Sequence, residues 1–201
     1  MKKLMLIALM VLLAVPGVMG SQTDEVKQFA EKKISVVIGL LKDKSLSKEV
    51  RDKKIIATVN PLLDFDRMAK ISLGKEGWTG MNDAQQKKFL DLFVKQLQTS
   101  YLQKLDLYTD EEVEVEHAKQ VKNRIHVTTL LVSKTDKMEM VYKFYKSKKK
   151  GWMVYDVVIL GVSVVQTYRS QFSNLLKEGG YDNLFKKLET MAVNIQTPNK
   201  K

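Results

Sequence analysis

The spacing of apolar residues changes along the chain from a helical period to an alternating one after Leu105. Between Thr23 and Leu105 the apolar residues recur every three or four positions, which predicts amphipathic helices. Ser47 and Asn82 are placed to cap two of these helices, and Pro61 suits the first turn of another. We therefore expect helices over residues 23–42, 48–60, 61–74 and 82–105.

From Glu112 onward the polar and apolar residues alternate, which is typical of antiparallel strands. We expect four strands, over residues 112–117, 124–131, 138–144 and 152–160, joined as a meander by polar turns. Two helices, over 163–178 and 181–193, follow on either side of Gly179-Gly180. The predicted fold is α+β, with helices packed on a curved four-stranded antiparallel sheet that is NTF2-like in character.

The stretch from Gly151 to Phe172 organises the rest of the chain. Its first half has apolar residues in both alternation sets: Trp152, Val154, Val158 and Leu160 in one, and Met153, Tyr155, Val157 and Ile159 in the other. A strand of this kind has to be covered on both faces, so we expect it in the centre of the sheet. Gly161-Val162-Ser163 then leads directly into a helix that Ser163 is placed to cap, and we expect the core and any cavity at this junction.

The first twenty residues have the form of a cleaved secretory signal. Lys2 and Lys3 precede the apolar run 4–15, and Val18 and Gly20 are small residues before a cut at Ser21. We expect a single domain over residues 21–195 and a disordered tail over 196–201. Loss of Lys2 and Lys3 would lower the formal charge from +11 to +9, because 32 basic residues would remain against 23 acidic ones. For an exported protein, that charge favours anionic lipids or acidic partners over nucleic acid.

The sequence offers little for catalysis. It contains no cysteine, no G-x-S-x-G elbow and no H-E-x-x-H helix. Its two histidines, His117 and His126, lie on adjacent predicted strands, and surface or packing roles are favoured for them over a metal site. Asp156 is the one titratable residue within the central strand, where Arg169 or Tyr168 would be its partner. A hydrogen-bonded structural role is favoured for Asp156, and a catalytic base is the alternative.

The apolar residues of the sheet and helices allow two interpretations. A well-filled core accounts for most of them. An exported protein with helices over a curved sheet also favours an elongated apolar pocket, and Met138, Met140 and Met153 are flexible side chains that suit a lining for variable chains.

Motifs across nearly the whole chain after residue 20 resemble the MlaC (toluene-tolerance, Ttg2-type) family of periplasmic phospholipid-binding proteins. Those motifs are Asp64-Phe65, Leu73-Gly74 with Trp78, the Phe89 to Tyr108 helix pattern, Tyr155-Asp156-Val157, Gly161-Val162-Ser163, Tyr168-Arg169-Ser170-Gln171-Phe172 and Gly179-Gly180-Tyr181-Asp182-Asn183-Leu184. The chain departs from the family's L-G-x-x-W pattern, because three residues separate Gly74 from Trp78.

The resemblance implies a periplasmic carrier in a Gram-negative bacterium. Such proteins hold phospholipid acyl chains as cargo, without a cofactor or a catalytic activity. They shuttle lipid between an outer-membrane lipoprotein–porin complex and an inner-membrane ABC transporter with an MCE-domain subunit, which maintains outer-membrane lipid asymmetry. The resemblance therefore implies phospholipid and these complexes as partners, transient membrane contact, and a monomer.

The residues give three groups of site predictions. Val162 is the first candidate for the pocket lining, followed by Phe93, Leu97, Tyr142, Phe144, Val154 and Val158. A structural motif comprises Asp156, Gly161, Ser163, Tyr168 and Arg169, and Lys148, Lys149 and Lys150 are candidates for partner or headgroup contact. The alternative is an NTF2-like isomerase that uses Asp156 with Tyr142 or Tyr168 as an acid–base pair, and a third reading is an envelope adaptor with a filled core.

Overall fold

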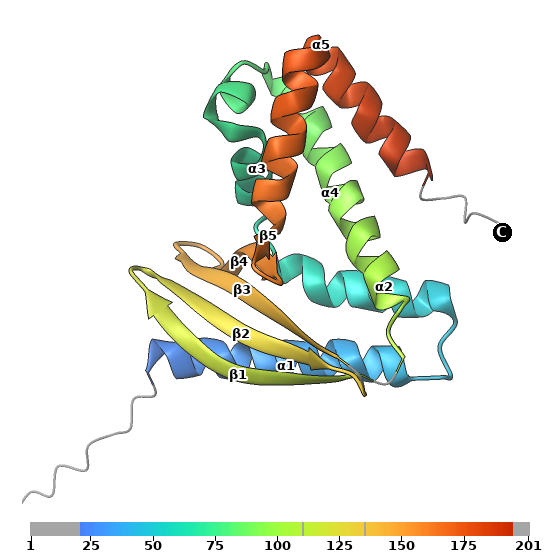
Figure 1. The fold of residues 1–201 in the computed structure, drawn as a ribbon, viewed down its shortest axis with the longest axis vertical. Helices are drawn as coiled ribbons and strands as arrows, with labels where there is room; N and C mark the ends of the chain where they lie inside the picture. Colours follow the sequence, from blue (N-terminus) through green and yellow to red (C-terminus); the bar gives the residue numbers. More distant parts are fainter. Residues whose placement is uncertain (1–20, 110, 135, 195–201) are drawn as a thin grey trace, which may run out of the picture.

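A computed structural model describes residues 21–109, 111–134 and 136–194 of the chain. The predicted signal (1–20) and tail (196–201) lie outside these residues. Helices come first, a sheet follows, and a long bent helix ends the described chain (Figure 1). The elements are α1 (Gln22–Lys42), α2 (Lys48–Val59), the 3-10 turn η1 (Asn60–Leu62), α3 (Phe65–Thr79), α4 (Asp83–Leu105), β1 (Glu112–Val121), β2 (Arg124–Val132), β3 (Lys137–Ser147), β4 (Gly151–Ile159), β5 (Val162–Ser163) and α5 (Val164–Asn194).

The helices begin at side-chain caps and bend at glycines. Ser47 and Asn82 cap α2 and α4 as predicted, and Gln85 completes a capping box with Asn82. Gly74 interrupts α3 with a φ of 79°, a left-handed conformation that glycine adopts without strain. Gly179 and Gly180 divide α5 into the two helices that the sequence predicts.

The strands form one antiparallel sheet in the order β1-β2-β3-β4-β5. The four long strands of the prediction are present, and the two-residue β5 is an addition. Leu160 (φ 48°) and Gly161 (φ 79°) both have positive φ, which is the backbone of a two-residue hairpin turn. This turn pairs Ile159 with Val162. The α+β fold class is therefore confirmed, with one short strand more than expected.

The predicted central strand, β4, has long pairing on one side only. It pairs with β3 along its length and with β5 at its end. On its free edge, Leu63 forms a parallel bridge with Val154, and the Asp64 N–H donates to the Val154 carbonyl at 2.9 Å. The segment before α3 thus takes the place of a neighbouring strand, and residues 153–156 are buried as the apolar pattern requires.

Two hydrophobic clusters lie within the described residues. One packs α3, α4 and α5 together around Phe89, Phe93 and Phe172, whose rings lie 5.5–6.2 Å apart. The other packs α1 against one face of the sheet. Figure 1 shows α3, α4 and the first part of α5 gathered at the β4–β5 edge, whereas α1 runs along the sheet. Leu63 packs against both clusters and therefore joins them.

Candidate functional site

The face of the sheet that packs on α1 carries a row of residues across all five strands that is apolar except at Thr129. Directly paired residues of antiparallel strands lie on the same face. The pairings therefore align Val115, Thr129, Met140, Ile159 and Val162 in order from β1 to β5.

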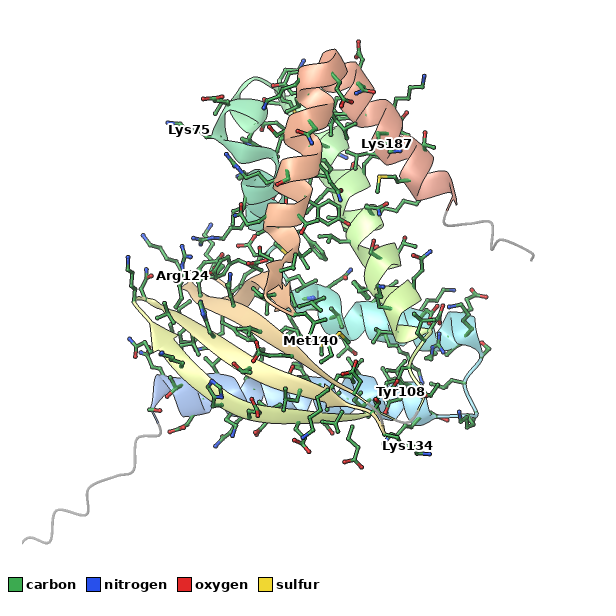
Figure 2. All side chains as sticks on the ribbon, in the orientation of Figure 1. Lys75, Tyr108, Arg124, Lys134, Met140 and Lys187 are labelled. Atoms are coloured by element: carbon green, nitrogen blue, oxygen red, sulfur yellow. The ribbon has the colours of Figure 1, made fainter. Side chains whose placement is uncertain are left out.

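This face is closed at one end and open at the other. At the closed end Ile125, Val127 and Phe144 are buried against Val26 and Ala30 of α1. Toward the open end the apolar side chains are incompletely covered, and Val162 is 60% exposed. The half-buried members are Met138, Met140, Tyr142, Val157 and Ile159. We refer to these five residues with Val162 as the open apolar face; in Figure 2 Met140 is labelled between β3 and α2.

Three helices frame the open apolar face. α1 packs against β1, β2 and α2, and η1, which continues α2, reaches β4. The Tyr101 hydroxyl of α4 donates to Asn60 Oδ1 of η1 at 3.3 Å, and burial raises the pKa of Tyr101 to about 12. The preceding turn of α4 includes Gln96, whose buried Oε1 has no hydrogen-bond partner among the described residues.

Tyr142 is surrounded by protein without being fully covered. Burial raises the pKa of its phenol, and a hydrogen bond with Thr129 partly opposes that effect. Part of the side chain nevertheless remains accessible. Tyr142 packs against the cluster between α1 and the sheet, on the face predicted for it, and its contact with lipid stays a prediction.

The predicted lining residues do not form one surface. Phe93 is fully buried in the helical cluster with Leu97, and Phe144 and Val154 are buried against α1. Val162 is on the expected side of the sheet but is exposed rather than enclosed. Val158 is paired with Ser163 on the opposite face, so its predicted orientation is wrong. Contact of any of the seven with lipid stays a prediction.

A β-bulge explains the error at Val158. The pairing shifts between Lys143 and Phe144, which face Asp156 and Val154, so Tyr155 is an extra residue in β4. The alternation therefore changes parity there. Trp152 and Val154 share their face with Val157 and Ile159, which strict alternation from Trp152 assigns to the other side.

Asp156 is the centre of a buried hydrogen-bond cluster at the strand-to-helix junction. Asp156 is 2% exposed. Its carboxylate accepts from Lys143 Nζ at 2.9 Å and from Ser163 Oγ at 2.9 and 3.0 Å. The backbone N–H of Val165 donates to it at 3.3 Å. Ser163 Oγ in turn accepts from Gln166 N at 3.2 Å, so the same hydroxyl caps α5.

The predicted partners of Asp156 are elsewhere. Arg169 donates to the Ile71 carbonyl at 3.3 Å and lies over Gly74, and Tyr168 packs on Phe93 and Phe172 in the helical cluster. They lie on α5 beyond its first turn, so neither reaches Asp156, and Lys143 from β3 supplies the charge instead. Three donors on a buried carboxylate favour a structural, hydrogen-bonded role for Asp156.

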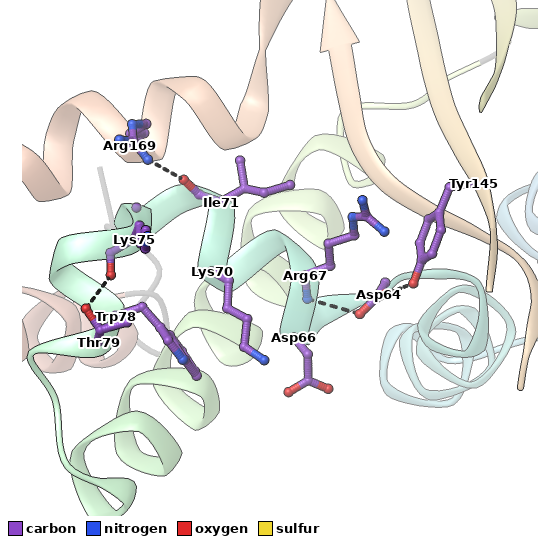
Figure 3. A pocket seen from close by; sticks show the side chains of 11 residues that line it. Asp64, Asp66, Arg67, Lys70, Ile71, Lys75, Trp78, Thr79, Tyr145 and Arg169 are labelled. Carbon is purple, nitrogen blue, oxygen red and sulfur yellow. Dashed lines mark hydrogen bonds between the residues drawn. The ribbon is translucent and has the colours of Figure 1, made fainter. Parts of the chain in front are cut away.

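A separate groove of about 640 Å³ lies between α3, α5 and β3. Figure 3 shows the side chains that line it. Its charged lining comprises Asp64, Asp66, Arg67, Lys70, Lys75 and Arg169, and Trp78 and Tyr145 contribute aromatic rings. The groove was not predicted from the sequence, because its four cations lie far apart along the two helices α3 and α5.

Lys148, Lys149 and Lys150 are exposed at the β3–β4 turn, and their contact with a partner or a headgroup stays a prediction.

Within the described residues, no three His, Asp or Glu side chains are grouped so as to hold a metal ion. None of the helices described here combines the length and apolarity needed to cross a bilayer.

The pKa of His126 is lowered first by burial and then by Lys143 and Arg124, while Asp156 opposes the shift.

Comparison with known proteins shows the family to which the chain belongs. The MlaC protein family profile matches residues 31–190. The intermembrane phospholipid transport system binding protein MlaC of Haemophilus influenzae is 26% identical over 113 residues, which is 54% of this chain and 53% of that protein, so the match spans about half of each. A phospholipid-binding protein from Ralstonia solanacearum, solved with a phospholipid, has the same fold, with a TM-score of 0.75, 21% identity, and coverage of 85% of this chain and 98% of its own. The chain belongs to the MlaC protein family.

Proposed function

We propose that this protein is a phospholipid carrier that holds acyl chains between the open apolar face and helices α1, α2 and α4. The observation that carries the proposal is the row from Met140 through Ile159 to Val162, which is apolar, faces the helices and is left uncovered at one end. Water-exposed apolar surface of this kind on an inner face is unfavourable unless a ligand covers it.

The energetic need for a carrier follows from the cargo. Each CH₂ kept from water contributes about 0.8 kcal/mol, so a chain of about 15 methylenes contributes about 12 kcal/mol. A lipid therefore leaves a bilayer extremely slowly unless an apolar surface receives it. The flexible side chains of Met138 and Met140 suit chains of different length and unsaturation.

In the cell, the protein would act in the periplasm of a Gram-negative bacterium as a monomer. It would receive or deliver lipid at an outer-membrane lipoprotein–porin complex and at an inner-membrane ABC transporter with an MCE-domain subunit, maintaining outer-membrane lipid asymmetry. The name of the Haemophilus influenzae relative supports a role in intermembrane phospholipid transport. Binding alone requires no cofactor and no catalysis, and the partners would supply the energy.

The test is mass spectrometry of the gently purified protein and of two matched glutamate variants. Val162→Glu places a carboxylate on the open apolar face, where burying it against acyl chains is costly. Val121→Glu makes the same change at an exposed strand position on the opposite face. We expect phospholipid with the parent and with Val121→Glu, and none with Val162→Glu, all with native circular dichroism.

Two results would contradict the proposal. A parent protein that carries no phospholipid and takes up none from vesicles is not a carrier. A folded Val162→Glu variant that retains as much lipid as the parent would exclude the open apolar face as the binding surface.

A further inference from the structure

The groove between α3 and α5 is lined by more cationic side chains than acidic ones. Arg67, Lys70, Lys75 and Arg169 line it, and no carboxylate of the described residues lies within 4.0 Å of any of their charged nitrogens. Unpaired cations around a concave surface attract anions, because the low-dielectric walls concentrate the field there.

The two carboxylates of the groove leave that excess in place. The Asp64 carboxylate is already hydrogen-bonded. It accepts from the backbone N–H of Arg67 at 3.0 Å and from the Tyr145 hydroxyl. Asp66 is exposed at the rim, beside Lys70 in Figure 3. Four cations against two carboxylates give the lining a formal charge of +2.

The groove is built rather than incidental. The guanidinium carbon of Arg67 lies 4.1 Å from the Tyr145 ring centroid, and Lys70 Nζ lies 5.1 Å from that of Trp78. Arg169 lies against Gly74, where a Cβ would overlap its guanidinium group. Aromatic rings therefore position Arg67 and Lys70, and the bare backbone at Gly74 leaves room for Arg169, whose Nη1 donates to the Ile71 carbonyl.

The groove opens on the other side of the sheet from the open apolar face. Tyr145 lines the groove, whereas its neighbour Phe144 points to the face that α1 covers. An anion in the groove is therefore not the headgroup of a lipid whose chains lie on the open apolar face.

Other cations extend the positive region along this side. Arg124 donates to the Tyr155 hydroxyl at 2.9 Å and lies over the same ring, which also contacts Tyr145. Figure 2 shows Arg124 and Lys75 toward the same edge of the molecule. Burial lowers the pKa of His126 on this face, Lys143 and Arg124 lower it further, and Asp156 opposes the shift.

We propose that the α3–α5 groove binds the phosphate of a membrane lipid headgroup and so docks the protein on an anionic bilayer surface. Arginine and lysine bind phosphate oxygens, and Trp78 is the type of residue that stabilises contact at a membrane–water interface. A concave site of headgroup size favours a phosphate group over the extended acidic surface of a partner protein. The site is separate from the cargo-binding surface, so the inference does not depend on the carrier function.

The magnitude follows from the charges removed. Each Lys or Arg near an anionic membrane contributes about 1 kcal/mol, which is about a fivefold change in affinity. The double variant Lys70→Gln/Lys75→Gln is therefore expected to bind about 30-fold more weakly. Both side chains are exposed, so the variant should fold and keep its cargo.

The experiment is co-sedimentation with vesicles of phosphatidylglycerol and phosphatidylcholine, using the chain without residues 1–20. Lys42→Gln/Lys44→Gln removes the same charge from exposed positions at the end of α1 and in the turn that follows it, and is the matched control. We expect the groove variant to lose about 30-fold in affinity and the control severalfold less. Glycerol 3-phosphate should release the parent at an ionic strength at which chloride does not.

Several outcomes would overturn the proposal. Equal losses in the groove variant and the control, or equal release by chloride and glycerol 3-phosphate, would mean that net charge alone drives binding. A groove variant that binds like the parent, or a parent that does not bind these vesicles, would remove the groove as a lipid site. Cargo content is measured on the same samples, so a failure of docking is distinguished from a failure to carry lipid.

Discussion

Replacing Asp156 by asparagine is expected to lower the stability of the protein and to loosen its hold on lipid. The substitution keeps the size of the side chain and removes its charge. An amide oxygen can still accept from Ser163 or from the Val165 N–H, but the new NH₂ group has to share the site with Lys143 Nζ, which lies 2.9 Å from the carboxylate. Lys143 then has no counter-ion.

The cost is set by how far water can reach Lys143. Breaking a fully buried ion pair costs about 3–5 kcal/mol. The Lys143 side chain is 25% exposed and the Asp156 side chain 3%, so water partly solvates the ammonium group that remains, and we expect about 2 kcal/mol. For a domain of this size that corresponds to a decrease of about 4–8 °C in Tm.

The assay is thermal unfolding followed by circular dichroism, with lipid content measured on the same preparations. Glu139→Gln removes an exposed carboxylate from the neighbouring strand and should leave Tm within about 1 °C. In Asp156→Asn/Lys143→Met the unpaired charge is gone, so the double variant should recover part of the loss. An Asp156→Asn protein as stable and as lipid-loaded as the parent would refute a structural role and return Asp156 to consideration as a base.

Two further substitutions test the backbone conformations on which the fold depends. In a urea titration, Gly74→Ala should lower the free energy of unfolding by more than about 1 kcal/mol, because φ is 79° and the new Cβ would displace Arg169. Gly39 has open space around it, so Gly39→Ala should be neutral or stabilising in the same titration. Leu160→Asn should raise the free energy of unfolding by up to about 1 kcal/mol in the same titration, since asparagine tolerates the positive φ of the hairpin turn. Leu160→Val should lower it, and the opposite order would show that the turn changes conformation in solution.

Most of the helical layer could be predicted because its signals are local. The caps at Ser47 and Asn82 and the breaks at Gly74 and Gly179-Gly180 all act within one or two turns of backbone. The bounds predicted for the third helix, 61–74, are wrong: Pro61 lies in η1, and α3 begins at Phe65 after the Asp64 cap and continues past the kink at Gly74 to Thr79. The sheet order was also accessible, since short polar turns between alternating segments favour a meander.

The candidate site was less accessible because it depends on non-local pairing. One extra residue at Tyr155 changes which face carries Val157 and Val158, and both alternation sets of β4 are apolar, so the sequence contains no signal for the bulge. The partner of Asp156 presents the same difficulty. Lys143 becomes its neighbour through strand register, whereas Arg169, close in sequence, is directed to Ile71 by the axis of α5.

The turn at Leu160 connects these features. An exposed leucine with a φ of 48° violates both the preference for polar surface residues and the preference for Asn or Gly in such a turn, and departures of this kind concentrate at functional sites. The turn directs Val162 back onto the open apolar face, and the bonds from Ser163 and Val165 to Asp156 fix its far end. The buried carboxylate therefore sets the position of the edge over which an acyl chain would enter, which is why loss of its charge is expected to affect stability and lipid retention together.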